Sequence, residues 1–190
     1  MNKNKILLVT FCIFLPILLL LFSYKVVLNS SDLTENQETT INFLENKQEL
    51  NLNYTSLETS HLKDVKKVMS FIDYLFYLSL IIITLIITHY KRNKKQLQKL
   101  IKYGGITTLI SIGIILLFAL ISFNSTFTIF HKIFFPQGNW LFPINSLLIQ
   151  TFPIDFFIGI STKVFLLTII LGSIFISLSY YLKNVHHKRC

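Results

Sequence analysis

Residues 6–28 read ILLVTFCIFLPILLLLFSYKVVL, a run with one charged side chain, Lys25, close to its end. A helix rises 1.5 Å per residue and needs about 20 mostly apolar residues to cross the hydrocarbon of a bilayer. The run is therefore long enough to span a membrane. Lys3 and Lys5 precede it and no small-residue cleavage site follows it, so we interpret the segment as a retained anchor rather than a signal peptide.

Three further apolar runs of similar length follow, at residues 68–88, 105–122 and 157–182. Backbone N–H and C=O groups cannot stay unpaired in lipid, and these runs are too long for barrel strands, so each is expected to be an α-helix. The composition agrees, because 52% of the 190 residues are hydrophobic and only 14% are charged. We therefore predict an all-α integral membrane protein with four transmembrane helices, in which residues 1–190 form a single membrane domain.

The charges predict the orientation of these helices. Basic residues fill segments 1–5, 91–102 and 183–189, and all 9 Asp and Glu residues lie elsewhere. Lys and Arg in short connections are held back on the cytoplasmic side of a membrane. This pattern predicts that both termini are cytoplasmic and that residues 29–67 and 123–156 are outer loops. The net charge of +9 thus indicates topology and not binding to nucleic acid.

The first outer loop contains a helix start. Thr55-x-x-Glu58 is a capping-box pattern, so a helix is expected to begin near Ser56 and to run without a break into the second span. Asp73 lies just inside that span, where an acid is costly without a partner. Lys66 is seven residues earlier on the same helix face and is the candidate partner. The alternatives are a polar cavity beside Asp73 or a neighbouring lysine that extends to the membrane interface.

The second outer loop, residues 123–156, is apolar and aromatic, and turn residues interrupt it at Pro136, Gly138, Pro143 and Pro153. Such a segment is expected to lie in the membrane interface or to re-enter the membrane. Irregular backbone at that depth persists only where protein or a wet cavity satisfies its polar groups, so a pocket is expected. A cluster of phenylalanines would line it: Phe130, Phe134, Phe135, Phe142 and Phe152.

Two of the five histidines are candidates for chemistry. His61 and His131 lie in different outer loops, whereas the others are among basic residues on the cytoplasmic side, namely His89, His186 and His187. A histidine titrates near pH ~6.5 and suits general acid–base catalysis at neutral pH. The alternative for each is an interfacial side chain. Asp64 is three residues after His61, on the same helix face, and is expected to orient its ring or to form a surface ion pair.

Gly138, Asn139 and Trp140 form a second candidate feature, because turned backbone amides there would bind an anion. A tryptophan of the membrane interface beside an ordinary turn is the alternative. A zinc or iron site made by two histidines and a carboxylate ranks below acid–base catalysis, because the chain has no close-spaced ligand pair such as HExxH. The two cysteines, Cys12 and Cys190, provide neither a disulfide framework nor a metal site.

Several blocks of sequence together resemble the lipoprotein intramolecular transacylase family of Gram-positive bacteria. They are TSHLKDVKKVM at residues 59–69, FHKIFFPQGNW at 130–140 and LLIQTFP at 147–153. The resemblance extends over nearly the whole chain. Members carry a histidine in each of the first two blocks, which correspond to His61 and His131. The family's aspartate and Gly-Asn-Trp correspond to positions Asp64, Gly138, Asn139 and Trp140.

This resemblance implies an acyltransferase. The sn-2 acyl chain of a diacylglyceryl-modified N-terminal cysteine would move to the α-amine of that cysteine and leave a lyso-form lipoprotein. His131 would act as base and acid and His61 as its partner, with these roles open to exchange. Backbone amides near Gly138 and Asn139, or the Trp140 indole, would bind the oxyanion. No cofactor is implied. The expected partners are a diacylated bacterial lipoprotein and membrane lipid, and the expected location is the bacterial cell membrane, with the active site on the extracellular side.

Two other functions remain open from the residues alone. A non-enzymatic four-helix membrane protein, holin-like or an accessory subunit, explains the charge and hydropathy equally well but not the two histidines in the outer loops. A metal-dependent lipid hydrolase predicts bound metal and release of free fatty acid. Both alternatives are separated from acyl transfer by substitution of His131 and analysis of lipoprotein N-termini.

Overall fold

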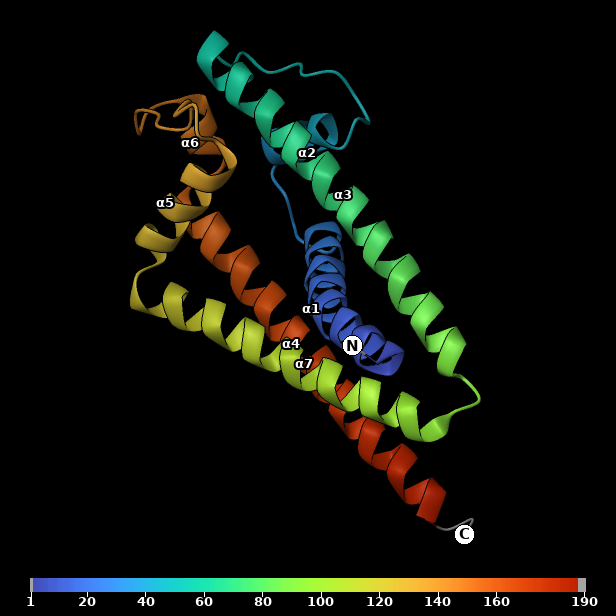
Figure 1. The fold of residues 1–190 in the computed structure, drawn as a ribbon. Helices are drawn as coiled ribbons and strands as arrows, with labels where there is room; N and C mark the ends of the chain where they lie inside the picture. Colours follow the sequence, from blue (N-terminus) through green and yellow to red (C-terminus); the bar gives the residue numbers. More distant parts are fainter. Residues whose placement is uncertain (1, 188–190) are drawn as a thin grey trace.

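The computed structural model describes residues 2–187, and these residues form helices and connections without a strand (Figure 1). Four long helices are candidate membrane spans. They are α1 (Lys3–Asn29), α3 (Ser56–Tyr90), α4 (Lys94–Ile121) and α7 (Ile154–His187). Three shorter helices are α2 (Glu35–Leu44), α5 (Phe123–Phe134) and α6 (Leu147–Thr151). The prediction of an all-α protein with four membrane-spanning helices is confirmed.

Helix α3 is longer than the apolar run within it. It has 35 residues, which is about 52 Å of helix, whereas the hydrocarbon is about 30 Å thick. The capping box predicted from the sequence is present, because Thr55 Oγ1 accepts from Glu58 N–H and the Glu58 carboxylate accepts from Thr55 N–H. Residues 56–67 therefore project beyond the membrane-spanning part of the helix, as the capping-box pattern predicted.

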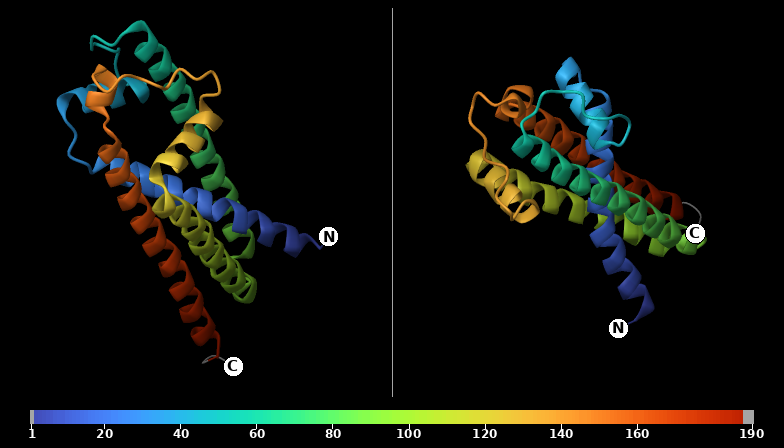
Figure 2. Two further views of the ribbon diagram at one scale, coloured as in Figure 1. Left: turned by 90° about the vertical axis from the view of Figure 1, so that its left-hand side faces the viewer. Right: turned by 90° about the horizontal axis from the view of Figure 1, so that it is seen from above.

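The projecting turns of α3 lie beside α2, α5 and α6 at one end of the molecule, and both termini lie away from that end (Figures 1 and 2). We call this end the cap, defined as residues 30–67 and 122–153. The loop between the third and fourth spans is thus largely helical. One side of α5 is strongly exposed, with Ile129 and Ile133 on it, whereas His131 is buried. An amphipathic helix of this kind is suited to the membrane interface.

Small residues allow the spans to pack closely. A Cβ added to Gly105 of α4 would lie 2.9 Å from the Gly172 carbonyl oxygen of α7. A Cβ on the neighbouring Gly104 would lie 2.7 Å from a ring carbon of Phe11 in α1. Transmembrane helices approach one another at such small residues because apolar surface gives no solvent-driven association in lipid. Helix α1 therefore lies centrally, in contact with α3, α4 and α7.

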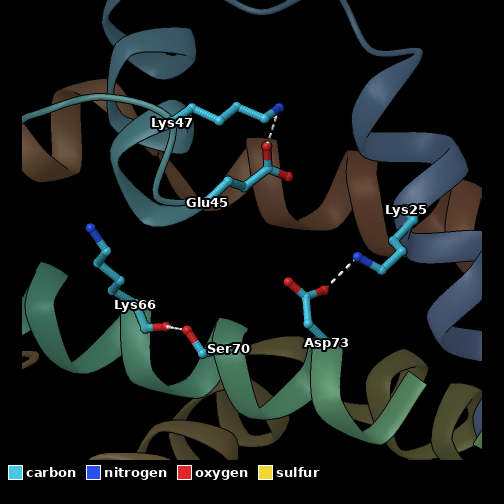
Figure 3. A network of polar contacts seen from close by, with 6 residues as sticks. All are labelled: Lys25, Glu45, Lys47, Lys66, Ser70 and Asp73. Atoms are coloured by element: carbon cyan, nitrogen blue, oxygen red, sulfur yellow. Dashed lines mark hydrogen bonds and ion pairs between the residues drawn. The ribbon is translucent and has the colours of Figure 1, made fainter. Parts of the chain in front are cut away.

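The partner of Asp73 is not the one expected. Asp73 of α3 pairs with Lys25 of α1, and Figure 3 shows the two side chains meeting between these helices. The ammonium of Lys66 lies instead 4.1 Å from the ring centre of Phe43, in a cation–π contact with the end of α2. The expected Lys66–Asp73 pair is wrong, because the basic partner comes from a different span and no spacing within α3 reveals it.

Candidate active site

His61 and His131 meet inside the cap. His61 lies on the projecting part of α3 and His131 near the end of α5, and their ring centres are 6.2 Å apart with 25° between the planes. Both side chains are buried, with 6% and 9% of their surface exposed. Two rings at this spacing are within reach of one substrate group held between or beside them. The fold thus brings together two histidines that lie in separate loops of the sequence.

Aromatic rings enclose the pair. Phe135, only 2% exposed, lies 4.7 Å from the His61 ring and 5.5 Å from the His131 ring. Trp140 lies 5.0 Å from the His131 ring, and Phe142 lies 5.6 Å from the His61 ring. These contacts exclude water from the flanks of both imidazoles. Both rings therefore lie in surroundings of low polarity.

The expected phenylalanine wall is partly correct. Phe130 reaches the His131 ring at 5.5 Å, but Phe134 stacks on Phe130 and remains partly exposed. Phe152 packs against Phe156 and Phe157. The ring nearest to His131 is one that the sequence did not single out. It is Phe127, at 4.0 Å and one helical turn before His131, and recognising α5 as a helix would have identified it.

The His131 ring has a defined tautomer. Its Nδ1 lies 2.8 Å from the carbonyl oxygen of Phe127. A carbonyl oxygen only accepts, so Nδ1 carries the hydrogen and Nε2 keeps its lone pair. Burial lowers the pKa of His131, and the hydrogen bond to Phe127 opposes this in part. The ring is therefore neutral at physiological pH, with a free lone pair on Nε2.

His61 is more strongly perturbed. Burial, followed by the proximity of His131, lowers its pKa to about 4, although Asn139 and Asp64 act in the opposite direction. Its Nδ1 is buried and has no hydrogen-bond partner among the described residues. Both histidines are thus neutral near pH 7, which is the protonation state that a proton acceptor requires.

Asp64 does not orient His61 by direct contact. Its Oδ1 accepts from Lys67 Nζ at 2.9 Å, and its Oδ2 accepts from the side-chain amides of Gln137 and Asn139 at 2.8 and 2.9 Å. The Lys67 hydrogen bond, with smaller contributions from Asn139 and Gln137, lowers the pKa of Asp64. The carboxylate is therefore charged, and it anchors the 136–140 turn to α3.

The three candidate residues of the 136–140 turn make different contacts. Gly138 has a φ of +77°, in the left-handed region that favours glycine, and its N–H donates to the Phe135 carbonyl at 3.1 Å. That amide is already used and is not free for an oxyanion. Asn139 turns its side chain toward Asp64, and Trp140 lies against His131.

Neither the groove between α1 and α4 nor the small cavity beside Lys25 and Asp73 contains this pair. The larger, of about 610 Å³, is an open apolar groove between α1 and α4, with Cys12 and Thr107 in its wall. It lies between two of the candidate membrane spans. Within residues 2–184, no three His, Cys, Asp or Glu side chains gather as a candidate metal-binding group.

Comparison with known proteins shows the family to which this chain belongs. The model of the family described as lipoprotein intramolecular transacylase Lit matches residues 4–157. The solved structure of the membrane-integral Lit from Bacillus cereus superimposes with a TM-score of 0.83 at 21% identity, covering 98% of this chain and 97% of that one. A variant of the same Bacillus cereus protein, with a histidine replaced by arginine, gives 0.81 at 19% identity over 98% and 95%. No curated protein matches. Because the family match covers most of the sequence, the chain belongs to the lipoprotein intramolecular transacylase family.

Proposed function

We propose that this acyltransferase moves the sn-2 acyl chain of a diacylglyceryl-modified cysteine to the α-amine of the same cysteine, with His131 and His61 as its proton-transferring groups. The observation that carries the proposal is the burial of two neutral imidazoles 6.2 Å apart within an aromatic enclosure. Family membership supports the reaction class. The substrate is then a diacylated lipoprotein of a bacterial cell membrane, and the product is its lyso form.

The reaction requires two proton acceptors in sequence. An N-terminal α-amine has a pKa of about 8, so it is mostly an ammonium ion at neutral pH. Forming the amide removes two protons from this nitrogen. One proton goes to solvent, and the other goes to the glyceryl oxygen as its ester bond breaks. A pair of neutral histidines suits this scheme, because one ring deprotonates the ammonium while the other carries the second proton to the leaving oxygen.

The tautomer of His131 supports its assignment as the shuttling base. Its Nδ1–H is committed to Phe127, so Nε2 is the atom that takes the proton from the attacking amine and returns it to the glyceryl oxygen. His61 deprotonates the ammonium or shares the proton with His131. No covalent enzyme intermediate is required, because the nucleophile and the ester belong to one substrate molecule.

The oxyanion is stabilised by N–H donors that make no other hydrogen bond among the described residues. The Gly138 amide is bonded to Phe135, which leaves the Trp140 indole N–H and the Asn139 backbone amide as the donors we propose. One such donor is commonly worth ~10² to 10³ in rate. Orientation of amine and ester within the enclosure contributes as well, and well-aligned intramolecular reactions gain about 7–11 kcal/mol.

The basic residues support an extracellular location of the cap. The turn between α3 and α4 carries Lys91 and Arg92, and α4 begins with Lys94 and Lys95. These residues lie at the end of the molecule opposite the cap (Figure 1). Under the positive-inside rule that end faces the cytoplasm. The cap would then stand above the outer leaflet, on the side where the lipid-anchored ends of bacterial lipoproteins are exposed.

The test is expression of the full chain in a bacterial host that makes only diacyl lipoproteins, with lipoprotein N-termini analysed by mass spectrometry. The wild-type chain should move one acyl group to nitrogen, and His131→Ala should abolish this. His89→Ala is the matched control, because His89 is exposed at the opposite end of α3 and should retain full activity. Lyso-form product from His131→Ala at matched expression would refute the assignment.

A further inference from the structure

Two buried polar atoms of the described residues lack hydrogen-bond partners, and both lie at the candidate active site. They are Nδ1 of His61 and the carbonyl oxygen Oδ1 of Asn139. An imidazole nitrogen that carries hydrogen donates, and an amide oxygen accepts. Leaving both unpaired in a buried site is costly, so their occurrence together indicates that the two atoms are partners for each other.

The orientation of the Asn139 amide follows from its other contact. Nδ2 of Asn139 lies 2.9 Å from Oδ2 of Asp64, and a carboxylate only accepts, so the NH₂ group faces Asp64. The carbonyl oxygen therefore points away from Asp64 and stays free to accept. Asp64 is one helical turn after His61 on the same face of α3, which holds the amide beside the His61 ring. Asn139 indeed acts on His61, where it opposes the lowering of the pKa by burial.

We propose that Asn139 is a positioning residue that links Asp64 to His61, with Asp64 holding its NH₂ group and its carbonyl oxygen accepting from Nδ1–H of His61. This inference rests on the proposed function, because it matters only if His61 transfers protons. The link fixes the hydrogen of His61 on Nδ1 and leaves Nε2 free to react. It also lets the Asp64 charge stabilise the imidazolium through the polarised amide. No proton moves to Asn139, since an amide oxygen is not basic.

The same arrangement then occurs twice. The Phe127 carbonyl holds Nδ1–H of His131, and the Asn139 carbonyl holds Nδ1–H of His61, so both rings present Nε2. The two hydrogen-bond acceptors differ in kind. Phe127 acts through backbone of the same helix, whereas Asn139 belongs to a turn that Asp64 must first capture. The reactive tautomer of His61 therefore depends on docking of that turn.

The chain offers a matched control in Gln137. Its side-chain amide donates to the same Asp64 oxygen at 2.8 Å, but the residue is exposed and makes no hydrogen bond to His61. Gln137→Ala removes one hydrogen bond from Asp64 and leaves Asn139 in place. Asn139→Ala removes a similar bond and also the acceptor for His61. Only the second variant should change the state of the His61 ring.

The experiment is ¹⁵N NMR of the histidine rings in the full chain, labelled with ¹⁵N-histidine, solubilised in detergent at neutral pH and assigned with His61→Gln. We expect an Nδ1–H tautomer at His61 in the wild type and in Gln137→Ala. Asn139→Ala should shift His61 toward the Nε2–H tautomer while His131 stays Nδ1–H, which shows that the cap is intact. In the lipoprotein assay, kcat should fall by roughly 10- to 100-fold with little change in KM.

An unchanged His61 tautomer in Asn139→Ala, or an equal change in Gln137→Ala, would overturn the proposal. If Asn139→Ala also alters His131, the decisive variant is Asn139→Gln, which keeps both an NH₂ group toward Asp64 and an acceptor toward His61. It should preserve the Nδ1–H tautomer, and loss of that tautomer there overturns the link. The tautomer is read without substrate, so this result is independent of the His131→Ala test of the acyl transfer itself.

Discussion

Glu58 of α3 accepts a hydrogen bond from the backbone N–H of Leu148 in α6 at 2.8 Å, across 90 positions of sequence. The same carboxylate caps its own helix through Thr55. Glu58 is 2% exposed, yet these hydrogen bonds outweigh the effect of burial and lower its pKa. One buried side chain therefore joins the two segments of the cap, and each segment carries one of the histidines.

Glu58→Ala should destabilise the cap. The Leu148 N–H and the first turn of α3 would both lose a partner, at a cost of about 1–3 kcal/mol. Thermal unfolding in detergent and protease cleavage within residues 30–55 and 135–146 measure the effect. Glu49→Ala is the control, because Glu49 is an exposed acid of the same segment. Equal unfolding temperatures for the two variants would contradict a joining role for Glu58.

The stability of the protein should fall with acid between pH 6.5 and about 4. The folded pKa of His61 is about 4, against an ordinary value of 6.5, so in this range the unfolded chain binds a proton that the folded chain does not. Stability then rises with pH across the window, by roughly 3 kcal/mol for a shift of this size. His61→Gln should flatten the dependence and His89→Gln should not. Denaturant unfolding at several pH values tests this, and an identical slope in all three proteins would refute it.

A single methyl group should disturb the packing of α4 on α7. The Cβ of Gly105→Ala would lie 2.9 Å from the Gly172 carbonyl oxygen, and this backbone cannot yield without moving a helix. A loss of about 1–3 kcal/mol is expected. Gly113→Ala is the control, because its Cβ would meet nothing within 4 Å. Melting temperatures in detergent compare the two, and an unchanged value for Gly105→Ala would show that the helices are less tightly packed than described.

Loss of the phenylalanine ring that contacts both histidines should admit water to the candidate site. Phe135 contacts both imidazoles and is 2% exposed, so Phe135→Ala opens space beside the reacting groups. Transfer to nitrogen should fall by roughly 10²-fold, because small displacements of aligned groups are costly. Free fatty acid should rise relative to N-acyl product as water competes. Phe135→Leu keeps most of the bulk and should preserve the ratio. A uniform loss of both products in the alanine variant would contradict a shielding role.

The parts of this fold that depend on local patterns could be predicted from the sequence. Four apolar runs indicate four spans, and Thr55 with Glu58 marks the start of α3, because a capping box is complete within four residues. Contacts between distant segments leave no such pattern. Lys25 as the partner of Asp73 is one example, and Leu148 as the partner of Glu58 is another.

In the candidate site, too, local features could be predicted from the sequence and contacts between distant segments could not. Two histidines in two outer loops could be predicted as a pair from topology, and their catalytic roles stay a prediction. The hydrogen bonds of Asp64 were missed, because Gln137 and Asn139 approach it from a turn more than 70 residues away. Phe127 was missed because the prolines and glycine of the second loop masked the helix that precedes them.

The contact between Glu58 and Leu148 offers a way for evolution to change the rate of the enzyme without changing its histidines. Each of the two cap segments contributes one imidazole, so the histidine pair exists only while residues 30–67 and 122–153 pack against each other. Under the proposed mechanism, the rate of turnover depends on the packing of these two segments. Substitutions at the contact between the two segments would then change the rate of turnover in small steps, while both histidines and the acyl specificity stay unchanged.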